Sequence, residues 1–204
     1  MYKIGILNDI HGNITALRRA VEKLQQLGCD ELIATGDLIA IGPCSAECLE
    51  YLRGLENFRA VKGNHELYYL KGTVGMSEGE VSHQNWVREQ LGESCRSYIS
   101  ALPMHLCREV YGKLLCFTHY AQREDGAFLP VRSPELAWLE RDFSYLPADV
   151  IFYGHHHMPS RLYGKKQYIN CGSLGCPHQC GGIAPVSYTQ LGCLGEALAE
   201  PKNS

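Results

Sequence analysis

The chain lacks long hydrophobic runs and long runs of basic residues. No apolar stretch among its 204 residues approaches the length of a membrane-spanning helix, about 20 residues, so we expect no membrane partner. The longest basic runs are pairs such as Arg18-Arg19 and Lys165-Lys166, and the formal net charge is −3. This balance gives no strong signal for nucleic-acid binding. The first residues follow a strand pattern and lack the charged-then-apolar layout of a signal peptide, which predicts a cytoplasmic protein.

Cysteine pairs at the close C-x2-C spacing are also absent, although the chain has 10 cysteines. Structural zinc sites usually combine two such pairs, and disulfide frameworks are typical of shorter secreted chains. The wider pairs Cys44 with Cys48 and Cys176 with Cys180 leave a separate zinc site open. Reduced thiols are the simpler interpretation, with Cys116 acting as a small hydrophobic residue inside a strand.

Length and composition are typical of one globular domain, which we predict over residues 1–204 with 192–204 as a loose tail. A buried strand over 3–8 precedes an amphipathic helix over 13–27, and this alternation predicts an α/β layered fold. Asn13, Ser45 and Ser133 are expected to cap helices. Further strands are expected over 31–35, 58–61, 104–110, 113–118, 150–153, 161–163, 167–170 and 185–191, further helices over 45–52, 81–91, 94–102 and 134–141, and a loop over 71–79.

One pair of polar residues follows the first strand. Asp9 and His11 are two residues apart, so in an extended backbone their side chains point to the same side and can converge on one ion. A carboxylate and an imidazole suit a divalent transition metal. Taken alone, the pair fits a hydrogen-bonded Asp/His contact without a metal better than it fits a metal site.

The ends of the other predicted strands carry further metal-capable residues. In open α/β sheets, ligands gather beyond the carboxyl ends of the strands, so we expect these side chains to meet. Two carboxylates, one amide and four imidazoles are too many for one tetrahedral ion and suit two ions that share a carboxylate. The residues are Asp9, His11, Asp37, Asn64, His119, His155 and His157.

The order of these motifs closely resembles the calcineurin-like metallophosphoesterases, and most of all their small single-domain bacterial and archaeal members. The resemblance covers roughly residues 1–191. It includes Asn170-Cys171-Gly172-Ser173, which matches the N-P-G-S segment of the family. The other matching motifs are Asp9-x-His11-Gly12-Asn13, Gly36-Asp37, Gly63-Asn64-His65-Glu66, His119 and Gly154-His155-x-His157.

The resemblance implies a sandwich of two mixed β-sheets flanked by helices and a site for two divalent transition-metal ions. Manganese is the ion expected first, with iron, zinc, cobalt or nickel as alternatives. The family pattern assigns Asp9, His11 and His157 to the first ion, Asn64, His119 and His155 to the second, and Asp37 to both.

The same resemblance implies the reaction. A hydroxide bridging the ions would attack the phosphorus of a small phosphodiester or phosphomonoester, a nucleotide among the candidates. His65 would act as the general acid on the leaving oxygen, and Asn13 would contact the substrate or groups around it.

Several positions depart from the family pattern. Ala40 stands where the protein Ser/Thr phosphatases carry an aspartate, which disfavours a protein substrate. Tyr120 replaces a glycine after His119, and His156 is expected to be a neighbour rather than a ligand. The loop after Ser173 commonly carries an arginine that meets phosphate, whereas this chain has Cys176-Pro177-His178-Gln179-Cys180, whose role the sequence leaves open.

Two other classes of function were considered. A retromer subunit uses this fold as a non-catalytic scaffold with its catalytic histidine replaced, but here His65 and the ligands are present. Cysteine-based phosphatase chemistry is disfavoured, because no cysteine lies in a phosphate-binding loop followed by arginine. Isolated His83 and His105 are expected to be ordinary surface or core residues. The oligomeric state stays open, a homo-oligomer included.

Overall fold

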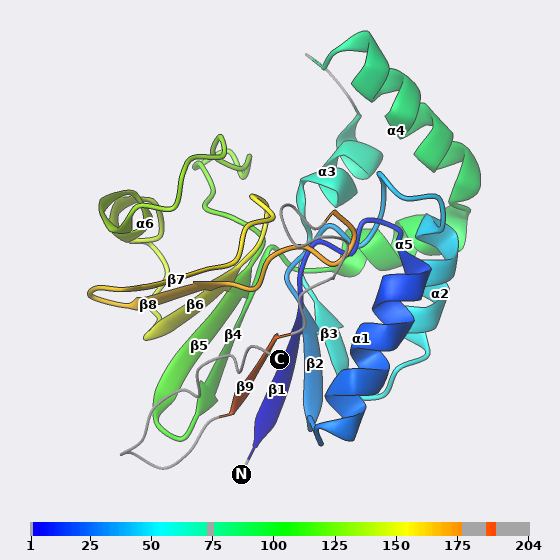
Figure 1. Cartoon of the computed structure of the whole chain (residues 1–204). Coiled ribbons are helices and arrows are strands. Elements are labelled where there is room, and N and C mark those ends of the chain that lie inside the picture. Colours follow the sequence, from blue (N-terminus) through cyan, green and yellow to red (C-terminus); the bar gives the residue numbers. More distant parts are fainter. Residues whose placement is uncertain (1, 73–75, 177–186, 191–204) are drawn as a thin grey trace.

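Two mixed β-sheets form the centre of the molecule (Figure 1). The computed structural model describes residues 2–72 and 76–176 and the backbone of 187–190. The first sheet has the order β3 (Phe58–Ala60), β2 (Glu31–Ala34), β1 (Lys3–Leu7) and β9 (Ser187–Gln190). The second has the order β4 (His105–Val110), β5 (Lys113–Thr118), β6 (Val150–Tyr153), β8 (Gln167–Asn170) and β7 (Ser160–Tyr163). Each sheet combines parallel and antiparallel pairs, so the predicted fold class is confirmed.

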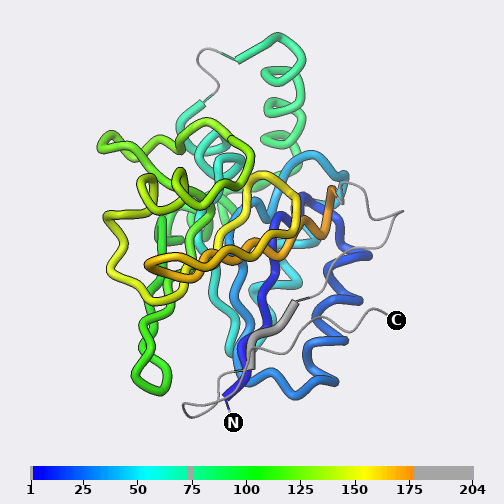
Figure 2. Tube along the Cα trace, turned by 60° about the vertical axis from the view of Figure 1, so that its left-hand side comes forward, coloured from blue at the N-terminus to red at the C-terminus, as the bar shows by residue number. Residues whose placement is uncertain are grey.

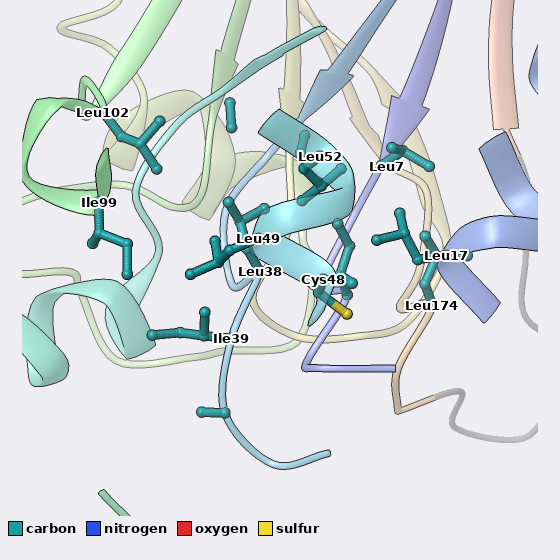
Figure 3. Close-up of a cluster of buried hydrophobic side chains, with 14 of the residues drawn as sticks. Leu7, Leu17, Leu38, Ile39, Cys48, Leu49, Leu52, Ile99, Leu102 and Leu174 are labelled. Carbon is teal, nitrogen blue, oxygen red and sulfur yellow. The ribbon is translucent and has the colours of Figure 1, made fainter. Parts of the chain in front are cut away.

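Helices cover the outer face of each sheet (Figure 1). On the first sheet, α1 (Ile14–Gln26) and α2 (Ser45–Arg53) share a core with Leu7 of β1 and Leu32 of β2 (Figure 3). On the second sheet, α6 (Leu136–Asp142) contributes Leu139 to a cluster with strand residues. The remaining helices are α3 (Asn64–Lys71), α4 (Glu78–Gln90) and α5 (Glu93–Ala101).

Alternation along the strands decides which residues face which layer. Ile4 and Ile6 of β1 pack against Phe117 and Phe152 of the second sheet, because side chains two apart share one face of a strand. The rings of Phe117 and Phe152 stack with their centroids 5.0 Å apart. Gly5 faces the helices, and a Cβ there would meet side-chain atoms of Leu24 on α1 at 2.9 Å. The apolar contacts between the sheets therefore fix how they are aligned.

The structure corrects several sequence predictions. Residues Asn64–Lys71 form the helix α3, which the sequence did not predict. Asn13 does cap α1 by accepting a hydrogen bond from Ala16 N–H, whereas Cys44 and Glu135 take the capping positions expected for Ser45 and Ser133. The predicted loop over 71–79 includes the last residue of α3 and the first two residues of α4, and its residues 73–75 lie outside the described residues, as does the predicted tail over 192–204.

The interpretation of the cysteines as reduced thiols is wrong for one pair. Cys107 and Cys116 form a disulfide between β4 and β5, because the register of this hairpin places them directly opposite each other. Cys44 and Cys48 are free thiols, as the sequence predicted. None of the described helices is long and apolar enough to cross a membrane.

A buried glutamate links the two sheets. Glu31 of β2 accepts hydrogen bonds from Arg59 Nε of β3 at 2.9 Å and from Arg108 Nη2 of β4 at 2.9 Å. Tyr2 Oη donates to the same carboxylate. The carboxylate is almost fully buried while both arginines are partly exposed, so solvent screens part of the attraction.

We expect Glu31→Gln to lower the free energy of unfolding by about 1–2 kcal/mol, because it weakens charge-assisted hydrogen bonds across the sheets. Urea denaturation measures this, with Glu109→Gln as the control, since Glu109 lies exposed on β4. Equal stability of the two variants would show that the link between Glu31 and Arg108 adds nothing.

Candidate metal centre

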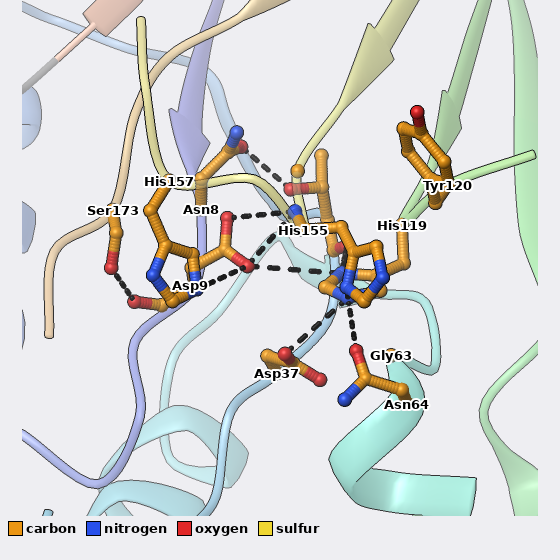
Figure 4. Close-up of polar contacts among 12 residues, drawn as sticks. Asn8, Asp9, Asp37, Gly63, Asn64, His119, Tyr120, His155, His157 and Ser173 are labelled. Carbon is orange, nitrogen blue, oxygen red and sulfur yellow. Dashed lines mark hydrogen bonds and ion pairs between the residues drawn. The ribbon is translucent and has the colours of Figure 1, made fainter. Parts of the chain in front are cut away.

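Donor side chains gather where strands of both sheets end (Figure 4). Residues after β1, β2 and β3 come from the first sheet, and residues after β5 and β6 come from the second. The structure places all the predicted ligand residues at this edge of the molecule, namely Asp9, His11, Asp37, Asn64, His119, His155 and His157.

The backbone is strained at most of these positions. A positive φ is uncommon for residues other than glycine and costs on the order of 1–3 kcal/mol, so it persists where surrounding structure imposes it. Such strain is often concentrated at functional sites. The positive φ angles are 49° at Asp9, 47° at His11, 52° at Asp37, 77° at His155 and 59° at His157.

One group of donors contains Asp9, His11, Asp37 and His157, whose ligand atoms lie within 4.8 Å of one another. His11 Nε2 lies 2.9 Å from His157 Nε2 and 3.8 Å from Asp37 Oδ2. His157 Nε2 lies 3.6 Å from Asp9 Oδ1. Three of the four residues are almost completely buried.

A second group contains Asp37, His119 and His155. His119 Nε2 lies 3.1 Å from His155 Nδ1, 3.3 Å from Asp37 Oδ2 and 2.9 Å from Asn64 Oδ1. The other ring nitrogen, His119 Nδ1, lies 3.0 Å from the Thr35 carbonyl oxygen and donates to it. This contact orients the ring so that Nε2 is the nitrogen that faces the other donors. Asp37 is the residue that belongs to both groups.

The donor atoms fit divalent metal ions. Atoms that bind one ion at about 2.0–2.2 Å lie roughly 3 Å from one another, and imidazole nitrogen with carboxylate oxygen suits transition metals. The His11–His157 nitrogen pair at 2.9 Å and the His119–His155 pair at 3.1 Å meet this condition. Two facing imidazole nitrogens can share a proton, one donating to the other, or can bind one cation together.

Burial and charge shift the ionisation of these groups in the ion-free protein. Burial opposes ionisation of Asp37, but His119 and His65 outweigh it, and its pKa lies well below the usual value. Burial raises the pKa of Asp9 to about 7 despite the attraction of His119. Burial lowers the pKa of His119, but Asp37 and Asp9 outweigh this and raise it to about 9. A proton on His119 thus supplies positive charge that a bound cation would replace.

His65 lies beside the first group. Its ring contacts that of His11, with centroids 5.2 Å apart, and its backbone N–H donates to Asp37 Oδ1 at 3.0 Å. Gln84 of α4, which is 2% exposed, places Nε2 at 3.1 Å from His65 Nδ1. Burial lowers the pKa of His65. The amide of Gln84 thus fixes the orientation of this imidazole.

Glu66 supports the loop that carries Asp37. Its two carboxylate oxygens accept hydrogen bonds from the backbone N–H groups of Asp37, Leu38, Ile39 and Gly63. Gly63 is required here, because a Cβ would lie 2.2 Å from Asp37 Oδ1. Glu66 is fully buried. Sequence reasoning gave neither Glu66 nor Gln84 a role, although Glu66 belongs to one of the matching motifs.

The predicted N-P-G-S-like segment packs against the strand end that bears Asp9. Ser173 Oγ donates to the Asp9 carbonyl oxygen at 2.9 Å (Figure 4). Asn8 Nδ2 donates to the Tyr153 carbonyl oxygen at 2.8 Å, and Thr35 Oγ1 donates to Asn8 Oδ1 at 2.6 Å. These bonds tie β1, β2 and β6 together beneath the donors.

The remaining predicted positions lie at the margin. Asn13 uses its side-chain oxygen to cap α1. His156 contacts the Tyr153 hydroxyl and is not among the grouped donors. Cys176 places its sulfur within 4.8 Å of ring nitrogens of His11 and His157, which the sequence did not indicate. His178 and Cys180 lie outside the described residues.

Comparison with known proteins gives relatives of two kinds. An uncharacterized protein of Methanocaldococcus jannaschii is 26% identical over 207 residues, covering 91% of this chain and 80% of that protein. A symmetrical bis(5'-nucleosyl)-tetraphosphatase of Cronobacter sakazakii is 35% identical over 103 residues. That match covers 42% of this chain and only 36% of the tetraphosphatase.

Solved structures share the fold at low sequence identity. A metallophosphoesterase from Sphaerobacter thermophilus has a TM-score of 0.70 at 20% identity, covering 92% of this chain and 82% of the other. Vps29 of Chaetomium thermophilum has a TM-score of 0.57 at 15% identity, covering 95% and 81%. The model of the calcineurin-like phosphoesterase superfamily domain matches residues 2–189. With two donor groups at the shared edge of two sheets and a family match over nearly its whole length, the chain belongs to the calcineurin-like phosphoesterase superfamily.

Proposed function

We propose that the protein is a dinuclear metal-dependent phosphoesterase that hydrolyses a small phosphodiester or phosphomonoester. The observation that carries this proposal is the pair of donor groups that share Asp37, with His65 beside them. Asp9, His11 and His157 would hold one ion, and Asn64, His119 and His155 the other. Manganese is the ion proposed first, with iron, zinc, cobalt or nickel as alternatives.

The ions, when bound, would supply Lewis acidity at phosphorus and lower the pKa of the attacking water. His65 would hold its proton toward the leaving oxygen, while Gln84 keeps the ring in place through Nδ1. Asn13 would contact the substrate at the rim of the site. The close approach of Gly63 and the hydrogen bond from the His65 backbone N–H would keep the Asp37 carboxylate fixed between the two donor groups.

The similarity to tetraphosphatases over part of the chain supports a nucleotide among the substrates. A cytoplasmic location is part of the proposal. Because cytoplasmic thiols are kept reduced, the Cys107–Cys116 disulfide is the observation that counts against it. The alternative, a non-catalytic interaction scaffold, predicts no hydrolysis even in metal-loaded protein.

The test is hydrolysis of bis-p-nitrophenyl phosphate, a diester, and of p-nitrophenyl phosphate, the monoester, with added manganese. Metal content per chain is measured on the same sample. Metal-dependent release of p-nitrophenol supports the proposal. No hydrolysis of either ester, in protein shown to hold metal, would refute it and favour the scaffold.

His65→Gln is expected to lower kcat by about 10²–10⁴-fold for an alkyl ester and by less for a p-nitrophenyl ester. The reason is that an alkoxide needs a proton to leave, whereas p-nitrophenolate does not. His105→Gln is the control, since His105 lies exposed on β4. Equal losses for both esters would assign His65 a role other than general acid, and full activity would assign it none.

A further inference from the structure

A cavity of about 350 Å³ opens next to His65, on the side formed by α3 and α4. Its described lining includes Ile41, Tyr68, Gly79, Glu80 and His83. We infer that this cavity binds the leaving group of the substrate, and that this group is neutral, aromatic and of the size of a nucleoside. The inference rests on the proposed function, because it assumes that His65 faces the leaving oxygen.

The position of the cavity assigns it to the leaving group. His65 belongs both to the cavity lining and to the edge of the donor groups, where its ring meets that of His11. A group that accepts the proton of His65 must therefore continue away from the donors, into this cavity. The helix α4, which forms one wall, projects from the end of the molecule where the site lies (Figures 1 and 2).

Aromatic and imidazole rings line one side of the cavity. His83 Nε2 accepts a hydrogen bond from Ile41 N–H at 2.8 Å, which fixes the imidazole and joins α4 to the loop after β2. The His83 ring lies 5.5 Å from the Trp86 ring at an angle of 32°. Tyr68 meets His65 edge-on at 5.6 Å. Ring faces and edges of this kind suit a flat aromatic ligand.

The charge of the lining disfavours an anion. Among the described lining residues none is lysine or arginine, the side chains that bind phosphate, whereas Glu80 is present. Hydrogen bonds from Ser77 lower the pKa of Glu80, so its carboxylate is ionised at neutral pH. A leaving group that carries phosphates would be repelled, but a neutral hydroxyl compound would not. The volume falls in the range of small-molecule sites, about 300–1,000 Å³.

Gly79 gives a direct test of the cavity. A Cβ at this helical position meets nothing within 4 Å, so Gly79→Leu can be built from this lining position into open space and favours the helix. Ser82→Leu on the same helix is the matched control, because Ser82 is exposed and is not among the lining residues. Glu80→Gln removes the charge while keeping an acceptor for the capping contact with Ser77.

Three phosphate compounds that differ in the leaving group separate the alternatives: the esters methyl phosphate and AMP, which release methanol and adenosine, and the phosphoanhydride ADP, which releases AMP. We expect kcat/KM for AMP to exceed both others by about tenfold or more, and Gly79→Leu to remove this advantage. Ser82→Leu should behave as the wild type, and Glu80→Gln should raise kcat/KM for ADP alone. Equal kcat/KM values for the three compounds, or a higher kcat/KM for ADP than for AMP, would overturn the inference.

The second experiment measures binding of adenosine to the metal-free protein by saturation-transfer NMR. We expect a signal in the wild type and in Ser82→Leu and its loss in Gly79→Leu. If neither these three compounds nor the p-nitrophenyl esters are hydrolysed but adenosine binds in this way, the proposed function fails while the aromatic site stands. If esters are hydrolysed but adenosine does not bind, the cavity assignment fails and the proposed function stands.

Discussion

Asp37→Asn is expected to abolish metal binding at both donor groups and to lower kcat/KM by roughly 10³-fold or more, the scale of removing a group that acts with its neighbours as a unit. Asp37 is the residue that both groups share, with Oδ2 at 3.8 Å from His11 Nε2 and 3.3 Å from His119 Nε2. An amide removes the negative charge that a pair of adjacent cations needs. It also withdraws the carboxylate that interacts with the buried imidazole of His119.

Calorimetric titration with manganese and thermal unfolding measure this effect. At a metal concentration of 100 times Kd the wild type should gain about 2.7 kcal/mol of stability for each ion that it binds, and Asp37→Asn should gain none. Asp125→Asn is the control, because Asp125 is exposed and an asparagine can still accept from Ala127 N–H. An Asp37→Asn protein that binds two manganese ions with wild-type affinity would contradict the assignment of Asp37 to both groups.

Glu66→Gln is expected to lower the free energy of unfolding by about 2–4 kcal/mol even without metal, because it leaves buried backbone donors unpaired. Each carboxylate oxygen of Glu66 accepts from two backbone N–H groups, those of Asp37 and Gly63 at Oε2 and those of Leu38 and Ile39 at Oε1. A glutamine has one acceptor oxygen, so its NH2 group would face two of these donors.

Urea denaturation of metal-free protein tests the effect of Glu66→Gln. Glu50→Gln on α2 is the control, since Glu50 is exposed. We further expect Glu66→Gln to weaken metal binding, because the loop after β2 carries Asp37. A variant as stable as the control would mean that water or a shifted backbone satisfies the four N–H groups.

The sequence predicted the strands and the residues at their ends well, for a physical reason. The apolar runs before Asp9, His119 and His155 are short and buried, and each of these three residues lies two positions after the last apolar residue of its run. These signals are local. Their meeting at one edge follows from parallel strands, which alternation with helices indicates. All the predicted ligand residues therefore lie together.

The parts that the sequence missed depend on contacts between distant residues. Gln84 is 19 residues from His65 and meets it through the packing of α4 on α3. Glu66 binds backbone groups up to 29 residues away, so its own neighbours give no sign of this role. The Cys107–Cys116 disulfide could have been predicted from the sequence, because a hairpin centred on Tyr111-Gly112 places these two residues opposite each other.

The donors come from two sheets that are joined mainly by apolar contacts. Asp9, His11, Asp37 and Asn64 follow strands of the first sheet, and His119, His155 and His157 follow strands of the second. Each donor group contains residues from both sides. Both donor groups therefore form only when the two sheets pack against each other, and a shift of one sheet along the other would separate histidines from aspartates. Metal affinity would therefore also report the stability of the packing between the two sheets.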